Sequence, residues 1–302
     1  MDNTSQEFGL FIDNIRRSRN MSREDFVDGI ISTRQFQRYL KGESSISIKK
    51  IVMLIDKLEL EFFAIYNCFT KSTNNEYNII NNIYTHIMQL EYKEAYIIIT
   101  KYKDYDFSSL YYQKIFNLYN ILINHKLLRI SDEMAINHIE KNIDYSNVMK
   151  TKELNFVELT ALLYISQIVK DESKCKNIIT KLYDVIKYNK ISNFNETKLK
   201  MITIYSSFSK LLGIQKEYKK VIFITKKGIG LCEESKTTTS LAHLYYYCSL
   251  AYLGQNNEEK ALDYARKTFF TLEIENVESR YKVFIKRFEE HFNIKFKDFK
   301  TW

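Results

Sequence analysis

Residues 21–43 read MSREDFVDGIISTRQFQRYLKGE and predict two short helices joined by a turn. Ser22 is expected to begin the first helix, because a serine oxygen can accept a hydrogen bond from the backbone amide three residues later, where Asp25 stands. Gly29 is expected to end this helix. Ser32 or Thr33 then begins the second helix, which runs to about residue 41. Two short helices in this order are typical of a helix-turn-helix motif.

The second helix of the pair has one apolar and one polar face. Phe36 and Tyr39 or Leu40 are three or four residues apart, so they share a face and are expected in the core. The opposite face carries side chains that can hydrogen-bond to DNA, namely Arg34, Gln35, Gln37, Arg38 and Lys41. Arginine can pair in a bidentate manner with guanine, and glutamine with adenine, in the major groove. The pattern therefore predicts a recognition helix for duplex DNA.

The same segment resembles the Xre/Cro-type helix-turn-helix, with the same span of 22 residues from the first apolar residue to the closing glycine. Within that group it is most similar to the Rgg branch of the RRNPP peptide-sensing regulators, in which a GxIS…QxxRFxxGE pattern is typical. That pattern stands here as Gly29-Ile30-Ile31-Ser32, Gln35, Arg38, Tyr39, Gly42 and Glu43. The following stretch, SISIKKIVMLIDKLEL, also resembles that branch. The resemblance covers the first 68 residues, and beyond them it concerns architecture alone.

The motif suggests a role for each polar residue. Residues near the start of a recognition helix make most base contacts in such domains, so Thr33, Arg34 and Gln35 are expected to read bases. Ser22 and Arg23, which open the first helix of the motif, are expected to hold phosphate. Arg38 and Lys41 can contact either a base or a phosphate. The complete predicted DNA-binding set is Ser22, Arg23, Thr33, Arg34, Gln35, Gln37, Arg38 and Lys41.

Two residues depart from the pattern of these relatives. Leu40 stands where they usually carry glutamate, which is expected to enlarge the core. Gln37 stands where they usually carry serine, which leaves the preferred DNA sequence open.

Composition favours an all-α chain. It has no proline and only seven glycines among 302 residues, whereas a β-rich protein needs many turns that use these residues. Helical spacing marks a first helix through Phe8, Phe11, Ile12 and Ile15, and a fourth one whose apolar stripe is expected to be Ile48, Ile51, Val52, Leu54, Ile55 and Leu58. A fifth helix is expected near 61–69. The polar stretch 70–76 is the predicted linker.

From residue 77 onward the sequence repeats. Five polar turns each lead into a helix that carries a small or apolar residue at the same place, and the spacings are 40, 40, 46 and 40 residues between Ala95, Ala135, Cys175, Val221 and Ala261. A period near 40 with two helices per repeat is typical of a helical solenoid. The repeats resemble tetratricopeptide (TPR) repeats, most clearly the last, through Tyr245, Tyr252 and Ala261. Cys248-Ser249 replaces the leucine–glycine pair of that motif, so the repeats are TPR-like.

Polar residues cluster on the expected inner face of two repeats. If Ala135 marks the second helix of its repeat, the preceding helix presents three asparagines, and the next repeat presents three further polar groups. Asparagine both donates and accepts hydrogen bonds, which suits an extended peptide backbone. The predicted peptide-binding set is Asn117, Asn120, Asn124, Thr160, Tyr164 and Gln167. Asparagine is frequent throughout the chain, so an origin in composition alone stays open.

Charge and cysteine usage narrow the functional classes. The formal net charge is +8, and between Asn14 and Lys50 nine basic residues outnumber four acidic ones, a local excess of +5 that fits a polyanion partner. The four cysteines and five histidines have no metal or redox spacing, so no metal or cofactor is expected. Gly228-Ile229-Gly230, read as a helix end, follows no strand and does not predict a phosphate loop. No catalytic pairing of nucleophile and base appears, so an enzyme is not expected.

These observations favour a cytoplasmic, sequence-specific DNA-binding regulator, because neither a secretory signal nor an apolar run of membrane-spanning length is visible. Residues 1–69 are expected to bind double-stranded DNA as a homodimer, and residues 77–302 to bind a short signalling peptide and to dimerise. The peptide and its role in quorum sensing are implied by the resemblance. Two alternatives stay open. One is a prophage-type regulator whose repeats only dimerise or recruit a protein, and the other is a repeat scaffold without DNA binding.

Overall fold

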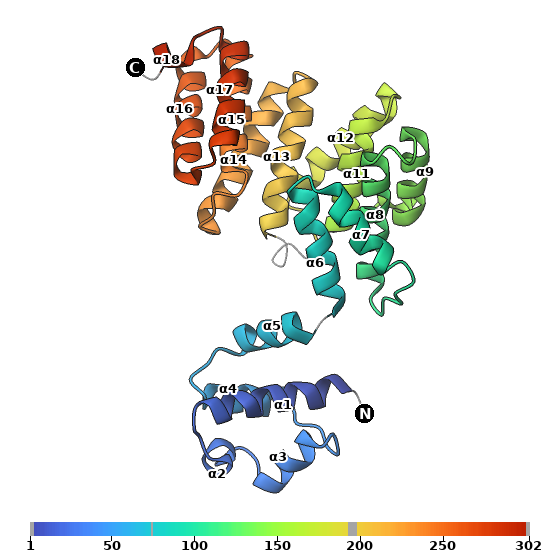
Figure 1. Ribbon diagram of the computed structural model, residues 1–302, viewed down its shortest axis with the longest axis vertical. Helices are drawn as coiled ribbons and strands as arrows, with labels where there is room; N and C mark the ends of the chain where they lie inside the picture. Colours follow the sequence, from blue (N-terminus) through green and yellow to red (C-terminus); the bar gives the residue numbers. More distant parts are fainter. Residues whose placement is uncertain (1–2, 74, 193–197, 300–302) are drawn as a thin grey trace. The chain divides into compact units, whose positions relative to one another are not determined.

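The computed structural model describes residues 3–73, 75–192 and 198–299. Within these ranges the regular secondary structure is helical, apart from a single bridge between Leu154 and Ile191, which confirms the all-α prediction. The chain divides into two compact units, Met1–Gln89 and Leu90–Trp302 (Figure 1). We call these the N-terminal and the C-terminal unit. None of the helices formed by the described residues is long and apolar enough to cross a membrane.

The N-terminal unit contains the five predicted helices and one more. Their bounds are α1 (Asn3–Ser18), α2 (Arg23–Val27), α3 (Thr33–Leu40), α4 (Ile48–Asp56), α5 (Phe62–Thr73) and α6 (Asn75–Met88). Helix α5 extends four residues beyond the predicted end at residue 69, into the predicted linker 70–76. Residue 74 of that linker lies outside the described residues, and the functional division at 70–76 remains a prediction.

Local signals set the ends of α2 and α3 as expected. The oxygen of Ser22 accepts a hydrogen bond of 3.0 Å from the backbone N–H of Asp25, and Ser32 caps α3 in the same manner. Gly29 and Gly42 follow the two helices with φ angles of +76° and +73°, a region that glycine enters without steric cost. The turn at Gly29 connects the two helices of the motif, and the turn at Gly42 ends the second helix.

Aromatic packing holds α3 against α2. The rings of Phe26 and Phe36 meet edge to face with centroids 5.3 Å apart, and both side chains are fully buried. Tyr39 is buried as predicted, and Leu40 packs against the same core while partly exposed. The apolar face of α3 therefore faces inward, and its polar face is left on the outside.

The predicted apolar stripe of α4 is wrong at two positions. Ile51, Leu54, Ile55 and Leu58 are buried, but Ile48 and Val52 are exposed by 69% and 41%. At about 100° per residue the four buried side chains cover an arc of roughly 100°, which is the width that one packing face usually takes. The two exposed side chains lie beyond the edge of that arc.

A buried carboxylate joins α1 to the start of α2. Asp13 is 1% exposed and lies 2.8 Å from Nε of Arg16, 2.8 Å from Nη2 of Arg17 and 3.3 Å from Nη2 of Arg23. Burial alone would raise the pKa of Asp13, but hydrogen bonds from Arg16 and Arg23 and the nearby positive charges hold that pKa below its ordinary value. Arg16 also donates to the carbonyl oxygen of Met21. The carboxylate thus fixes the helix that leads into the motif.

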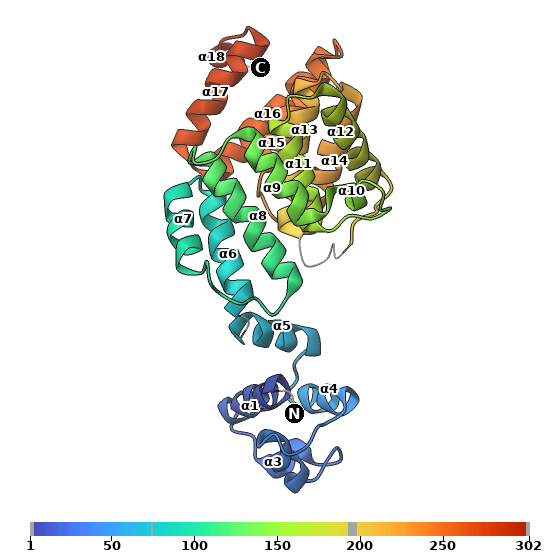
Figure 2. The ribbon, with the colours of Figure 1, turned by 90° about the vertical axis from the view of Figure 1, so that its right-hand side faces the viewer.

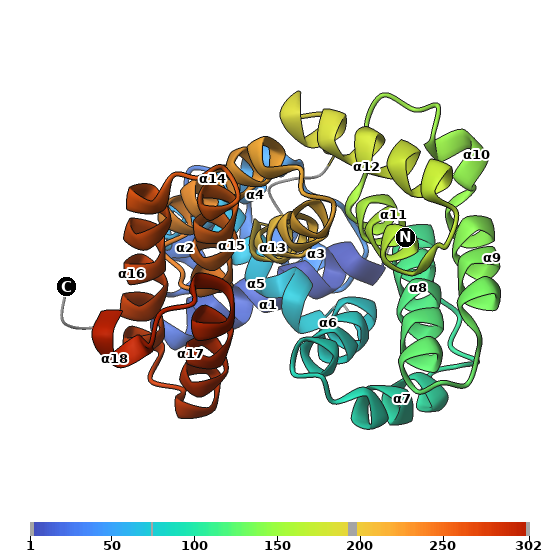
Figure 3. The same ribbon diagram turned by 90° about the horizontal axis from the view of Figure 1, so that it is seen from above.

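The C-terminal unit is an array of paired helices. Its elements are α7 (Tyr92–Lys101), α8 (Leu110–Lys126), α9 (Asp132–Ile143), α10 (Tyr145–Val148), α11 (Phe156–Ile168), α12 (Glu172–Lys187), α13 (Lys198–Ile214), α14 (Tyr218–Glu234), α15 (Leu241–Leu253), α16 (Glu258–Glu275), α17 (Glu278–Phe292) and α18 (Phe296–Phe299). Figure 3 shows α8, α11, α13 and α15 along the inner side of a curved array, with α9, α12, α14 and α16 outside them.

The five small or apolar residues that mark the repeat period are all buried. Each lies in the first two turns of an outer helix (α7, α9, α12, α14 and α16), and their exposed fractions range from 0% to 9%. A small side chain at this position lets the outer helix approach its inner partner closely.

Gly228 and Gly230 lie inside α14 and not at its end, so the expectation of a helix end was wrong. A Cβ at Gly228 would lie 2.8 Å from Cδ2 of Leu244 on α15 and 3.2 Å from Cβ of Tyr205 on α13. A Cβ at Gly230 would meet nothing within 4 Å. Only the first glycine is therefore required by packing.

We expect Gly228→Ala to destabilise the C-terminal unit by about 1–3 kcal/mol, because the added methyl group forces α13, α14 and α15 apart. Gly230→Ala is the matched control, which should stabilise the same helix by roughly 0.5–1 kcal/mol through lost chain entropy in the unfolded state. Urea unfolding followed by circular dichroism measures both. Equal stability of the two variants would contradict this packing.

We expect Asp13→Asn to lower the free energy of opening of α1 and α2 by about 3 kcal/mol, because Arg16 then keeps a buried charge without its partner. Hydrogen exchange of amides in residues 3–27 of the full chain measures this opening. Asp56→Asn, a change at an exposed aspartate of the same unit, is the control and should have little effect.

The same carboxylate should make the N-terminal unit sensitive to acid. The folded pKa of Asp13 is depressed, so its stabilising effect is complete above the unfolded pKa of about 4 and is lost as the pH falls through the lower folded pKa. The stability of the wild type should thus fall more steeply below about pH 4 than that of Asp13→Asn. Parallel curves would refute the assignment.

Candidate DNA-binding helix and ligand pockets

Helix α3 presents its polar face to solvent. Arg34, Gln37, Arg38 and Lys41 are exposed, and Thr33 and Gln35 are partly exposed. Figures 1 and 2 show α3 at one edge of the N-terminal unit, with α1 and α4 on its other side. All the predicted residues of α3 and its C-cap are thus brought together on an accessible surface.

Intramolecular contacts restrain this face little. Nε of Arg38 lies 3.8 Å from Oε2 of Glu43, and both side chains are more than half exposed. An exposed ion pair of this kind contributes about 0–1 kcal/mol. Arg38 can therefore leave Glu43 for a phosphate or a base at small cost.

The two predicted phosphate contacts at the start of α2 are less available. The hydroxyl of Ser22 donates to Oδ2 of Asp25 at 2.6 Å besides capping the helix. Arg23 is 32% exposed and its Nη2 lies 3.3 Å from Asp13. A phosphate at this position has to compete with the carboxylates of Asp13 and Asp25. Both residues nevertheless lie at the surface where the sequence predicted them.

The local excess of +5 has a structural part and an exposed part. It was counted from residue 14, and Asp13, which stands just before it, holds Arg16, Arg17 and Arg23. The other six basic residues of that stretch do not contact Asp13: Arg19, Arg34, Arg38, Lys41, Lys49 and Lys50. The count of charges began at residue 14 and so left out Asp13. For this reason it did not show that three of the nine basic residues are paired with an acid.

The three predicted asparagines of α8 divide into two groups. Asn117 and Asn120 line a shallow hollow of about 370 Å³, together with Ile121 and, from α9, His138, Lys141 and Asn142. Asn124 donates from Nδ2 to Oδ1 of Asn120 at 2.7 Å and to its carbonyl oxygen at 2.9 Å. The hollow lies between the two helices of one repeat, and no residue of α11 lines it.

The three predicted residues of α11 have different environments. Gln167 is exposed, whereas Thr160 donates to the carbonyl oxygen of Phe156 at 2.8 Å. Tyr164 is only 6% exposed, and its hydroxyl lies 2.8 Å from Nδ1 of His125 on α8. Burial raises the pKa of Tyr164 far above its ordinary range.

His125 extends this contact to the next helix. Its Nε2 lies 2.8 Å from Oδ1 of Asp132 on α9, and because a carboxylate oxygen only accepts, Nε2 carries the proton. In a neutral ring Nδ1 then accepts from the hydroxyl of Tyr164. Tyr164 thus links α11 to α8, and its hydroxyl has a partner within the protein.

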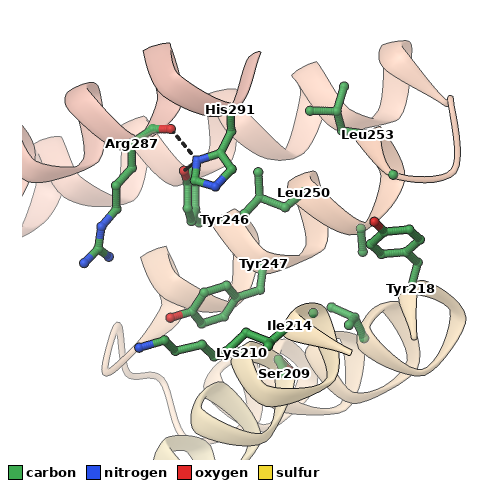
Figure 4. Close-up of a pocket in the computed structure, with 14 residues that line it drawn as sticks. Ser209, Lys210, Ile214, Tyr218, Tyr246, Tyr247, Leu250, Leu253, Arg287 and His291 are labelled. Carbon is green, nitrogen blue, oxygen red and sulfur yellow. Dashed lines mark hydrogen bonds between the residues drawn. The ribbon is translucent and has the colours of Figure 1, made fainter. Parts of the chain in front are cut away.

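Sequence reasoning missed a larger pocket between α13, α14, α15 and α17, which we call the C-terminal pocket (Figure 4). Its volume is about 580 Å³. Its walls are mostly apolar or aromatic, and the lining residues are Ser209, Lys210, Gly213, Ile214, Tyr218, Val221, Tyr246, Tyr247, Leu250, Ala251, Leu253, Gly254, Arg287 and His291. Figure 4 shows the ammonium group of Lys210, the hydroxyl of Tyr247 and the guanidinium of Arg287 pointing toward the same end of the pocket.

The C-terminal pocket has few sequence signals because separate helices supply its charged and hydrogen-bonding groups. Lys210 lies on α13, Tyr247 on α15, and Arg287 and His291 on α17. Within α17, Nδ1 of His291 lies 2.7 Å from the carbonyl oxygen of Arg287, so Nδ1 donates and Nε2 is left for other partners. Among the described residues no group of three or more His, Cys, Asp and Glu side chains could hold a metal ion.

No protein-family model and no curated protein matches the chain. Solved structures do match over nearly its full length. PlcR of Bacillus thuringiensis, in a complex with the peptide PapR7 and DNA, is 15% identical with a TM-score of 0.71, and the match covers 93% of this chain and 99% of PlcR. A putative transcriptional regulator of Listeria monocytogenes is 19% identical with a TM-score of 0.67, over 96% and 99% of the two chains.

A third match is ComR of S. thermophilus, solved in a complex with DNA and its signalling peptide ComS. It is 13% identical with a TM-score of 0.61, over 92% of this chain and 97% of ComR. At these identities the comparisons establish the fold. The chain has the helix-turn-helix and helical-repeat fold of the peptide-sensing RRNPP regulators, and the resemblance inferred from residues 21–43 is confirmed at the level of architecture.

Proposed function

We propose that the protein is a sequence-specific DNA-binding transcriptional regulator whose DNA binding is controlled by a short signalling peptide. The observation that carries the proposal is α3, whose buried aromatic face fixes an exposed row of arginine, glutamine and lysine side chains. A row of this kind can read base edges in the major groove. Because DNA is its target, we place the protein in the cytoplasm.

Two solved neighbours support the coupling of peptide to DNA. PlcR and ComR were each crystallised with both a peptide and DNA, and each match extends over both units of this chain. By analogy, residues 77–302 bind the peptide, and residues 1–69 bind DNA. The peptide then acts by binding one arrangement of the protein more tightly than another, which shifts the population between DNA-competent and incompetent states. This is the mode of action of a quorum-sensing regulator.

A homodimer fits this function. One small helix-turn-helix domain buries too little surface for high affinity, and such readers usually bind two half-sites about one helical turn apart. We therefore propose that two copies of the chain bind one operator, with the repeats providing the dimer contact.

The DNA-binding proposal predicts base-reading roles for Arg34 and Gln35. Against a duplex selected from random DNA, Arg34→Ala and Gln35→Ala should each weaken binding by about 1–3 kcal/mol, because a bidentate contact to one base is lost. Fluorescence anisotropy at physiological salt measures the affinity. Lys176→Ala, which removes one exposed charge from α12, is the control and should bind as the wild type does. Equal binding by the wild type and an Arg34→Ala/Arg38→Ala variant would exclude α3 as the reader.

The peptide proposal predicts a role for the asparagines of α8. In a screen of short peptides encoded by neighbouring reading frames, a binder should lose roughly 1–3 kcal/mol for each buried asparagine contact removed in Asn117→Ala/Asn120→Ala/Asn124→Ala. Asn137→Ala/Asn177→Ala changes exposed asparagines on α9 and α12 and serves as the control in the same calorimetric titration. If no peptide binds, or if the triple variant binds unchanged while folded, a regulator whose repeats only dimerise or recruit a protein becomes the better explanation.

A further inference from the structure

The C-terminal pocket combines an apolar floor with a positive end. Val221, Tyr246 and Ala251 are almost fully buried, with exposed fractions of 1% to 2%, and Leu250 lies beside them. Lys210 and Arg287 are exposed, and Figure 4 places their charged groups at one end of this floor. A ligand that fills the pocket therefore meets hydrocarbon along its length and two cations at one end.

These two cations have no counter-charge. In the described part of the chain neither Lys210 nor the guanidinium of Arg287 has an ion pair within 4.0 Å or a hydrogen bond, and the pocket lining contains no aspartate or glutamate. Neighbouring cations behave differently, since Arg280 lies 2.7 Å from Glu275 and Lys286 lies 4.0 Å from Glu290. The pocket therefore offers two cations and no acid to a ligand.

The positive field also acts on His243, which is partly buried on α15. Burial and, to a smaller extent, the positive charges of Arg280, Arg287 and Lys210 together lower the pKa of His243 to about 4. The ring is therefore neutral at ordinary pH, and it neither adds to the charge at the pocket nor neutralises it. The charges of Lys210 and Arg287 remain available to a ligand.

One hydrogen-bond donor stands beside the cations, because the hydroxyl of Tyr247 points toward the same end in Figure 4. Nε2 of His291 adds no donor, since Nδ1 donates to the carbonyl oxygen of Arg287 and Nε2 of a neutral ring only accepts. A carboxylate accepts hydrogen bonds from ammonium, guanidinium and hydroxyl groups together, and such charge-assisted bonds are stronger than neutral ones. A phosphate or sulfate would bring more charge but no apolar part for the floor.

We propose that the C-terminal pocket binds the C-terminal residue of a short peptide, with its carboxylate between Lys210 and Arg287 and its apolar or aromatic side chain on Tyr246, Leu250 and Ala251. The identity of this occupant rests on the proposed peptide-responsive function. A peptide end joins a carboxylate to a side chain on one carbon atom, which matches a positive end next to an apolar floor. The volume of about 580 Å³ lies in the usual range for such ligands.

The test uses the full chain and N-acetylated tryptophan, phenylalanine and leucine, each as the free acid and as the uncharged amide. Ligand-observed NMR at pH 7 measures the dissociation constants. At least one free acid should bind, and its amide should bind about tenfold or more weakly, because the charge-assisted hydrogen bonds are lost. Acid and amide binding alike, or no acid binding at all, would overturn the proposal.

Substitutions test the site itself. Lys210→Met/Arg287→Met should weaken the binding of the acid about tenfold or more and leave that of the amide nearly unchanged. Lys219→Met/Lys286→Met removes two exposed charges from α14 and α17 outside the pocket lining and should bind as the wild type does. Loss of binding in both variants would indicate a general charge effect and would contradict the site.

A further probe separates the sources of the carboxylate. Indole-3-propionate has the ring and the acid of N-acetyltryptophan without its peptide group, and it should bind more weakly if a peptide end is the ligand. Binding as tight as that of N-acetyltryptophan would assign the pocket to a small carboxylic acid and overturn the peptide occupant. The DNA titrations test the proposed function separately from the pocket. If the chain binds the acids selectively but binds no DNA, the proposed function is contradicted and the pocket proposal is not.

Discussion

Close approach of neighbouring helices is the constraint on which the C-terminal unit depends. A single helical hairpin cannot bury its apolar face, so each repeat is stable only against the next one. The five small or compact residues of the outer helices, and Gly228 between Tyr205 and Leu244, set how near these helices come. The same stacking determines where the inner helices lie, and so it creates the surfaces at which a ligand can bind.

The N-terminal unit solves a different problem, because it is small and must keep a charged face exposed. Its core includes the aromatic pair Phe26 and Phe36, and one carboxylate, Asp13, contacts three arginines at the junction of α1 and α2. Burying an ion group of this kind costs desolvation, and the hydrogen bonds from Arg16 and Arg23 offset that cost. The basic residues of this unit therefore have two roles: some build the fold, and those on α3 remain for a polyanion.

The two candidate ligand regions of the C-terminal unit differ in chemistry. The α8–α9 hollow carries amides that can hold a peptide backbone, although Asn120 and Asn124 already bond to each other. The C-terminal pocket carries cations without acids and an apolar floor, which suits a group of opposite charge at the end of an apolar ligand. A peptide has both backbone amides and a terminal carboxylate. A single peptide that binds in both regions must be long enough to reach from one to the other.

Local features of this protein follow from the sequence alone. The caps at Ser22 and Ser32, the turns at Gly29 and Gly42, the period of the repeats and the outward face of α3 all depend on neighbours within a few residues or on a fixed helical period. The residues of α3 could be assigned for this reason. By contrast, only the tertiary structure decided four other features. These are the exposure of Ile48 and Val52, the pairing of Asp13, the burial of Tyr164 against His125, and the C-terminal pocket. Each depends on how far apart packed helices lie and how they are rotated, and Lys210 and Arg287 line one pocket only because α13, α15 and α17 all border it.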